Sequence, residues 1–150
     1  MYSFTATYTR FLACLFVSAG WLLCNAFSAA ASETPEIVIT LRPLHSLVSM
    51  ITDGITEPKL LLSGQQDPHH FHLKPSQAKM LYAADMVFYL DTSLENYLSA
   101  AIEKSENKVD YVALAQVVEF QDDNRIHFWL DPNHAAAMLK LITETLMEAD

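Results

Sequence analysis

Glycine, cysteine and positive charge are scarce in this chain of 150 residues, which contains 3 glycines, 2 cysteines and 9 lysines and arginines. A nucleotide-binding fingerprint needs several closely spaced glycines, so a chain with so few of them cannot build one. The 18 acidic residues give a formal net charge of −9. That balance argues against a nucleic-acid-binding protein, which needs a basic face.

The first 31 residues have the layout of a secretory signal peptide, which predicts export to the periplasm. A polar start is followed by an apolar run at 11–24, and then by small residues that suit cleavage near Ala30 or Ala31. The apolar run is too short for a comfortable membrane span, although an uncleaved N-terminal anchor is the alternative. Both cysteines leave with this segment. The remaining chain, 32–150, therefore predicts one domain without disulfides or thiolate metal ligands.

Beyond the leader, short apolar runs alternate with segments of helical periodicity. The runs are typical of buried strands, and Pro43, Pro75 and Pro132 suit the first position of a helix. This alternation predicts an α/β fold, with a small parallel sheet of about four strands flanked by helices. In the helix expected from Pro75, the helical spacing of the apolar residues predicts that Tyr82 faces the core. The expected strands are 37–41, 58–62, 86–90 and 109–112. The expected helices start at Pro43 (ending near Gly54), at Pro75, after a cap at Asp91, Thr92 or Ser93, and at Pro132.

Five of the six histidines lie in or beside two segments that each lead into a helix. These are His69, His70 and His72 in 67–76, and His127 and His134 in or beside 126–132. Imidazole is the commonest protein ligand for zinc and related metals. Strand-to-helix loops meet at the carboxyl ends of parallel strands, where ligands bind. The sequence therefore predicts a metal-binding protein whose site is assembled from two distant loops.

The neighbouring histidines are not expected to act as one local clip. Alternation along an extended loop puts His70 and His72 on one side and His69 on the other. His45, on the first turn of the first helix, is a candidate for orienting a metal ligand or for an auxiliary role, as are His70 and His72. His134 is expected to face solvent.

Two further residues beside these segments have simpler structural explanations. Asp131 is better explained as the N-cap of the last helix than as a ligand. Trp129 is expected to belong to the core.

Common enzyme motifs are missing. The chain has no His-Glu-x-x-His and no Gly-x-Ser-x-Gly. A metal-dependent hydrolase with an open position on its ion is the alternative from another functional class. It requires a general base, and only Asp67 or a distant glutamate is available. The sequence favours a binding protein and not an enzyme.

Four motifs, occurring in order, resemble a known family. They are Val38-Ile39-Thr40-Leu41-Arg42-Pro43-Leu44-His45-Ser46-Leu47, Asp67-Pro68-His69 with Leu73-Lys74-Pro75-Ser76-Gln77, Ala83-Ala84-Asp85-Met86-Val87-Phe88, and His127-Phe128-Trp129-Leu130-Asp131-Pro132. They resemble the metal-specific solute-binding proteins of ABC importers, in particular the periplasmic zinc-uptake (Znu-type) members. The resemblance implies two lobes, each a small parallel sheet flanked by helices, joined by one long helix. It also implies that metal binds between the lobes and is delivered to an ABC permease in the inner membrane.

Carried over by position, His69 matches the family's first metal ligand and His127 the second. His70 and His72 match positions that do not normally bind, and His45 matches a cleft-side position. The family completes its site with a histidine and a carboxylate from a C-terminal lobe. This chain stops at about the end of the first lobe, so we expect an N-terminal metal-binding lobe with the C-terminal lobe absent. The implied metal is zinc; manganese or iron, which favour more carboxylate ligands, and a truncated product with an incomplete site are the alternatives.

Overall fold

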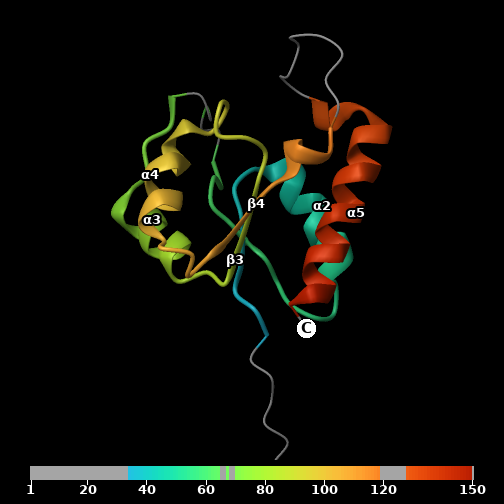
Figure 1. Ribbon diagram of the computed structural model, residues 1–150, viewed down its shortest axis with the longest axis horizontal. Coiled ribbons are helices and arrows are strands. Elements are labelled where there is room, and N and C mark those ends of the chain that lie inside the picture. The colour runs from blue at the N-terminus through green and yellow to red at the C-terminus, as the bar shows by residue number, and fades with distance from the viewer. Residues whose placement is uncertain (1–33, 65–66, 68–69, 119–127, 150) are drawn as a thin grey trace, which may run out of the picture. The chain divides into compact units, whose positions relative to one another are not determined.

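In a computed structural model of the chain, the structure describes residues 34–64, 67, 70–118 and 128–149. They form a four-stranded parallel sheet with helices against it (Figure 1), which confirms the predicted α/β class. The predicted signal peptide, with its cleavage site near Ala30 or Ala31, lies outside the described residues. In the part of the chain that is described, no helix has the length and apolar character needed to span a membrane.

Strands and helices alternate along the chain, and the sheet order is β2-β1-β3-β4 with every pairing parallel. Helices α2 and α5 lie on one side of the sheet, and α3 and α4 lie on the other (Figure 1). The elements are β1 (Ile37–Ile39), α2 (Arg42–Thr52), β2 (Lys59–Leu60), α3 (Pro75–Tyr82), β3 (Met86–Tyr89), the 3-10 turn η2 (Asn96–Leu98), α4 (Ser99–Lys104), β4 (Asp110–Ala113), the 3-10 turns η3 (Leu114–Val117) and η4 (Phe128–Leu130), and α5 (Pro132–Glu148).

The two central strands, β1 and β3, flank the point where the chain order in the sheet reverses. From β1 the chain passes through α2 to β2 on one side, whereas from β3 it passes through α4 to β4 on the other. Because α2 and α4 lie on opposite faces, their connections diverge at the carboxyl ends of β1 and β3. Ligands of open α/β sheets bind at such a switch point. The end of the sheet near Thr40 and Leu90 is therefore where a site is expected.

Both central strands are buried on both faces, as the β-branched and aromatic runs predict. Ile37 pairs with Met86, and Ile39 pairs with Phe88. Each fully buried aliphatic or aromatic side chain contributes about 1.5–3 kcal/mol. The helices α2 and α5 add further fully buried side chains to the core, namely Leu44, Val48, Met138 and Ile142.

Two helix boundaries agree closely with the predictions. α2 begins one residue before Pro43 and ends before Gly54, whose φ of +77° is a conformation that suits glycine. α5 begins at Pro132, and the Asp131 carboxylate accepts a hydrogen bond from the Asn133 amide at 2.8 Å. The predicted N-cap role of Asp131 is confirmed.

α3 also begins at Pro75 as predicted, whereas some other predicted boundaries are wrong. The helix expected from 91–93 begins only at Asn96, because Asp91 caps a turn instead: its carboxylate accepts from the Ser93 amide at 2.6 Å. Tyr82, expected to face the core, is 48% exposed. It is the last residue of α3, and Leu81 occupies the buried position beside it.

The first two strands are shorter than predicted. β1 stops at Ile39 and β2 spans only Lys59–Leu60. The apolar residues beyond each strand, Leu41 and then Leu61 and Leu62, stay buried. Hydrophobic runs thus marked the buried segments correctly but overestimated how far the strands extend.

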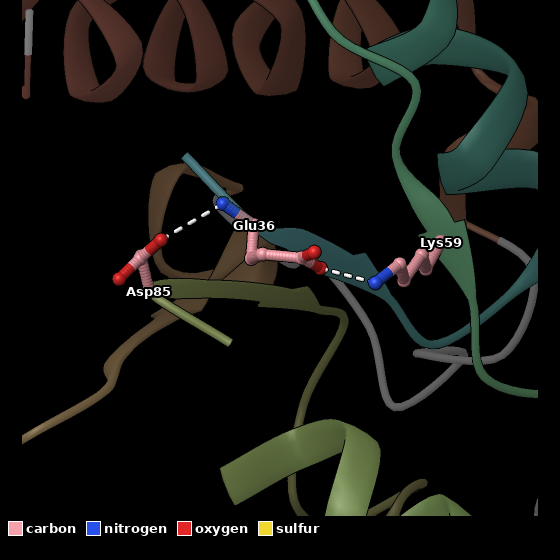
Figure 2. Close-up of polar contacts among 3 residues, drawn as sticks. All are labelled: Glu36, Lys59 and Asp85. Atoms are coloured by element: carbon pink, nitrogen blue, oxygen red, sulfur yellow. Dashed lines mark hydrogen bonds and ion pairs between the residues drawn. The ribbon is translucent and has the colours of Figure 1, made fainter. Parts of the chain in front are cut away.

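Polar contacts join the amino ends of three neighbouring strands (Figure 2). The Asp85 carboxylate accepts from the Glu36 amide at 2.8 Å, and the Lys59 ammonium pairs with the Glu36 carboxylate. The side chains of that ion pair are 51% and 50% exposed, so the pair contributes at most about 1 kcal/mol. These contacts lie at the end of the sheet opposite the switch point, and their residues can serve as controls for experiments there.

Tyr111 of β4 carries a buried hydroxyl with no hydrogen-bond partner among the described residues. Burial, together with the nearby Tyr82, raises the pKa of the Tyr111 phenol to about 12. Tyr111→Phe is expected to increase the free energy of unfolding by about 1 kcal/mol, because it removes the unsatisfied group and keeps the ring. Urea denaturation tests this, with the exposed Tyr82→Phe as the control. A clear destabilisation by Tyr111→Phe would contradict it.

Candidate metal site

A buried carboxylate, Glu95, lies at the switch point after the end of β3. Its Oε2 accepts hydrogen bonds from the Leu90 amide at 2.6 Å and the Asp91 amide at 3.4 Å. Its Oε1 accepts from the Tyr97 hydroxyl at 3.1 Å. The side chain of Thr40, directly after β1, also acts on this carboxylate by opposing the rise in pKa that burial causes, and its hydroxyl donates to the Phe88 carbonyl. Glu95 thus connects the carboxyl ends of both central strands.

Burial raises the pKa of the Glu95 carboxyl above its ordinary value, although the hydrogen bonds to it act in the opposite direction. Burial, and then the neighbouring Glu95, likewise raise the pKa of the Tyr97 phenol. Glu95 was not among the residues predicted from the sequence. The available signal was an acidic residue placed between the apolar residues Leu94, Tyr97 and Leu98, five positions after the predicted strand 86–90.

The loop that carries the first histidine segment, 67–76, begins where β2 ends at Leu60. His70 and His72 are exposed, and Phe71 between them is only 7% exposed. His70 and His72 are therefore exposed on either side of a buried residue, and the opposite orientation expected for His69 stays a prediction. Nδ1 of His70 lies 2.9 Å from the Asp67 carboxylate. His69 lies outside the described residues.

The two ends of the loop between β2 and α3 are joined by Gln77, a buried residue in the first turn of α3. Its Nε2 donates to the Leu61 carbonyl at 2.9 Å, and its Oε1 accepts from the Lys74 amide at 3.1 Å. The Arg42 guanidinium also donates to the Ser63 carbonyl, at the start of the loop. The loop is therefore fastened to the sheet and to α2 at its entrance, and to α3 at its exit.

Gln77→Ala is expected to decrease the free energy of unfolding by about 2 kcal/mol, because it leaves the buried Leu61 carbonyl without its donor and the part-buried Lys74 amide without its side-chain acceptor. The exposed Gln116→Ala is the matched control, with an expected change within about 0.5 kcal/mol. Urea denaturation measures both. Equal stabilities for the two variants would contradict the proposed role of Gln77.

The second histidine segment leads through η4 into α5. Phe128 is 7% exposed, and its carbonyl accepts a hydrogen bond from Nδ1 of His134 at 3.1 Å. The two rings pack edge to face, with centroids 6.3 Å apart. The prediction that His134 faces solvent is wrong, because Phe128 partly covers it. Trp129 packs against the core as predicted, although only partly buried.

His45, on the first turn of α2, uses its ring within the fold. Its Nε2 lies 2.9 Å from the Pro58 carbonyl oxygen, so that nitrogen must carry a hydrogen and donate. Its Nδ1 lies 3.4 Å from the Ser49 hydroxyl. The ring thereby ties α2 to the residue before β2. A role for His45 in orienting a metal ligand stays a prediction.

In the part of the chain that is described, no three histidine, cysteine or acidic side chains gather as a metal site. The predicted ligands His69 and His127 both lie outside that part, so their role stays a prediction. The structure does describe their immediate neighbours in sequence. His127 directly precedes the buried Phe128, and His69 precedes the buried Phe71 by two positions. In sequence, His127 therefore adjoins a buried residue, and His69 lies two positions from one.

Residues 37–150 match the family model described as zinc-uptake complex component A, periplasmic, or ZnuA. The chain belongs to the ZnuA family. This is a family of solute-binding transport proteins and not an enzyme family. The family membership predicted from the four motifs is confirmed.

Curated relatives carry the same family name. The high-affinity zinc uptake system protein ZnuA of Brucella abortus is 26% identical over 185 residues, which cover 91% of this chain and 55% of the relative. ZnuA of Yersinia pestis is 32% identical over 97 residues, which cover 64% of this chain and 29% of the relative. The chain thus spans about half the length of the Brucella protein.

Solved structures show the same fold. The periplasmic zinc-binding protein TroA of Treponema pallidum superimposes with a TM-score of 0.68 at 20% identity, covering 77% of this chain and 44% of TroA. A manganese-bound periplasmic metal-binding protein of Candidatus Liberibacter asiaticus gives a TM-score of 0.66 at 15% identity. The match covers 77% of this chain and 46% of that protein. At these identities the likeness shows the fold alone.

Proposed function

We propose that this ZnuA-family chain captures zinc in the periplasm and serves a zinc-uptake system of the ABC type, delivering the ion to a permease in the inner membrane. The match of residues 37–150 to the zinc-uptake family is the observation that carries this proposal. The signal-peptide layout of the first 31 residues supports the periplasmic location.

His69 and His127 are the proposed zinc ligands. Their segments lead into α3 and, through η4, into α5, and the first one leaves the sheet at the carboxyl end of β2. Two imidazoles supply half of the four-coordinate shell that zinc usually takes. The remaining donors are proposed to be a histidine and a carboxylate from a second lobe, as the family resemblance implies.

Transport without catalysis fits the residues at the switch point. A metal hydrolase needs a general base next to a metal-bound water. Glu95 is enclosed by hydrogen bonds from Leu90, Asp91 and Tyr97, so its oxygens are already occupied. Manganese is the second candidate cargo, because one protein with this fold was solved with manganese bound.

Deletion of the gene tests the proposal in the cell. In medium depleted of zinc by a chelator, the deletion strain is expected to accumulate less zinc and to grow more slowly than the wild type. Added zinc should restore growth, and so should the wild-type gene, whereas a His69→Ala, His127→Ala double mutant should not. Normal zinc accumulation together with reduced manganese accumulation would instead support the manganese alternative.

A further inference from the structure

We propose that Phe71, Tyr97 and Glu95 form a positioning clamp that fixes the first histidine segment relative to the end of β3. This inference rests on the proposed function, because it assigns these residues to the placement of a zinc-binding segment. None of the three touches the ion in this proposal. Glu95 is bonded to the backbone after β3, Tyr97 is bonded to Glu95, and Phe71 packs against Tyr97.

The outer part of the clamp is an aromatic pair. The rings of Phe71 and Tyr97 meet nearly edge to face, with centroids 5.0 Å apart and planes at 79°. Among the described residues of 63–74, Phe71 is the one buried side chain. Edge-to-face contacts of this kind favour one relative orientation of the two rings. The ring of Phe71 thus anchors the middle of the segment, as Gln77 and Arg42 anchor its ends.

The inner part of the clamp is the carboxylate of Glu95. It accepts a hydrogen bond from the Tyr97 hydroxyl, and its other oxygen accepts from the backbone of Leu90 and Asp91. Since Leu90 directly follows β3, the position of the Tyr97 ring is set by the sheet. Glu95 is fully buried, so water does not compete for these bonds.

Fixing the Phe71 ring also constrains the residues on both sides of it. His70 and His72 flank Phe71 and are exposed, while His69 is two positions earlier in the sequence. Residues that orient metal ligands commonly affect metal affinity, because a ligand already held in place loses less conformational freedom on binding. The clamp is therefore expected to strengthen zinc binding without contacting zinc.

Two variants test the clamp at separate points. Tyr97→Phe keeps both rings and removes only the hydroxyl bond to Glu95, whereas Phe71→Leu keeps an apolar side chain and removes the ring contact. The first measurement is hydrogen–deuterium exchange of the metal-free protein. Amides of residues 70–72 are expected to exchange several-fold faster in both variants, while those of β3 stay protected. The second measurement is zinc titration, with affinity expected to fall by about tenfold.

Matched controls separate positioning from general stability. Tyr111→Phe removes the same kind of phenol hydroxyl as Tyr97→Phe does, but from β4. Asp85→Asn weakens the hydrogen bond to the Glu36 amide at the amino ends of the strands (Figure 2). Both are expected to leave zinc affinity and exchange at 70–72 unchanged. Unchanged exchange at 70–72 in Tyr97→Phe and Phe71→Leu would overturn the clamp, and so would faster exchange with unchanged zinc affinity. If His69→Ala and His127→Ala leave zinc affinity intact, the proposed function fails. Hydrogen–deuterium exchange at residues 70–72 then remains as the test of whether the clamp fixes the segment.

Discussion

Alanine at His69 or at His127 is expected to weaken zinc binding by more than about a hundredfold, because even residues that only orient metal ligands change affinity by about 10- to 100-fold. Zinc usually has four protein or water ligands, and either substitution removes one of the two that this chain is proposed to supply. Titration against a chromophoric zinc chelator measures the change, and the double mutant should lose specific binding altogether.

Other histidines of the chain provide the controls for this experiment. His134 donates to the Phe128 carbonyl, so His134→Ala should change zinc affinity by less than about tenfold. His70→Ala is the sharpest control, because it alters the residue next to His69. An affinity loss in His70→Ala equal to that in His69→Ala would contradict the ligand assignment.

Removing the carboxylate of Glu95 is expected to have the largest effect on stability. Glu95→Ala leaves the Leu90 amide and the Tyr97 hydroxyl without their acceptor and opens a cavity, so the free energy of unfolding should decrease by about 3 kcal/mol. Glu103→Ala, at an exposed position in α4, is the matched control and should change it by no more than about 0.5 kcal/mol. Similar losses in the two variants would show that the Glu95 hydrogen bonds contribute little.

The pH dependence of stability follows from the raised pKa of Glu95. The folded state holds the carboxyl proton of Glu95 more tightly than the unfolded chain does. The protonated carboxyl therefore contributes to stability, and this contribution is fully present below the unfolded carboxyl pKa of about 4.3. This contribution to the free energy of unfolding is then lost progressively as the pH rises through the pKa of Glu95 in the folded state. Glu95→Gln removes this titration and keeps an acceptor, so its stability should vary less with pH than that of the wild type. An identical pH profile would contradict the assignment.

The sequence predicted the architecture well because its hydrophobic runs and its prolines are local signals. The buried runs at 37–41 and 86–90 correspond to the central strands, and Pro43 and Pro132 mark the starts of α2 and α5. The delayed start of the helix after β3 was missed, since it depends on the local turn capped by Asp91 and on Glu95, whose burial arises from tertiary contacts. Propensity carries no information about that burial.

The candidate site was predictable only in part. The histidine clusters and motif order identified the family, which the match over 37–150 confirmed. The contacts that fasten the histidine segment were not predictable, because Gln77 and Leu61 are far apart in sequence, as are Phe71 and Tyr97. His134 was misjudged for the same reason: its partner, the Phe128 carbonyl, becomes a neighbour only through the turn of η4.

Imidazole NMR during zinc titration tests most directly whether the two distant histidine segments share one ion. In protein labelled with ¹⁵N at histidine, the ring signals of His69 and His127 are expected to change together and to be complete at one zinc per chain. The signals of His45 and His134 should stay in place. Changes of the two rings at different zinc ratios, or a change of only one of them, would contradict a shared site.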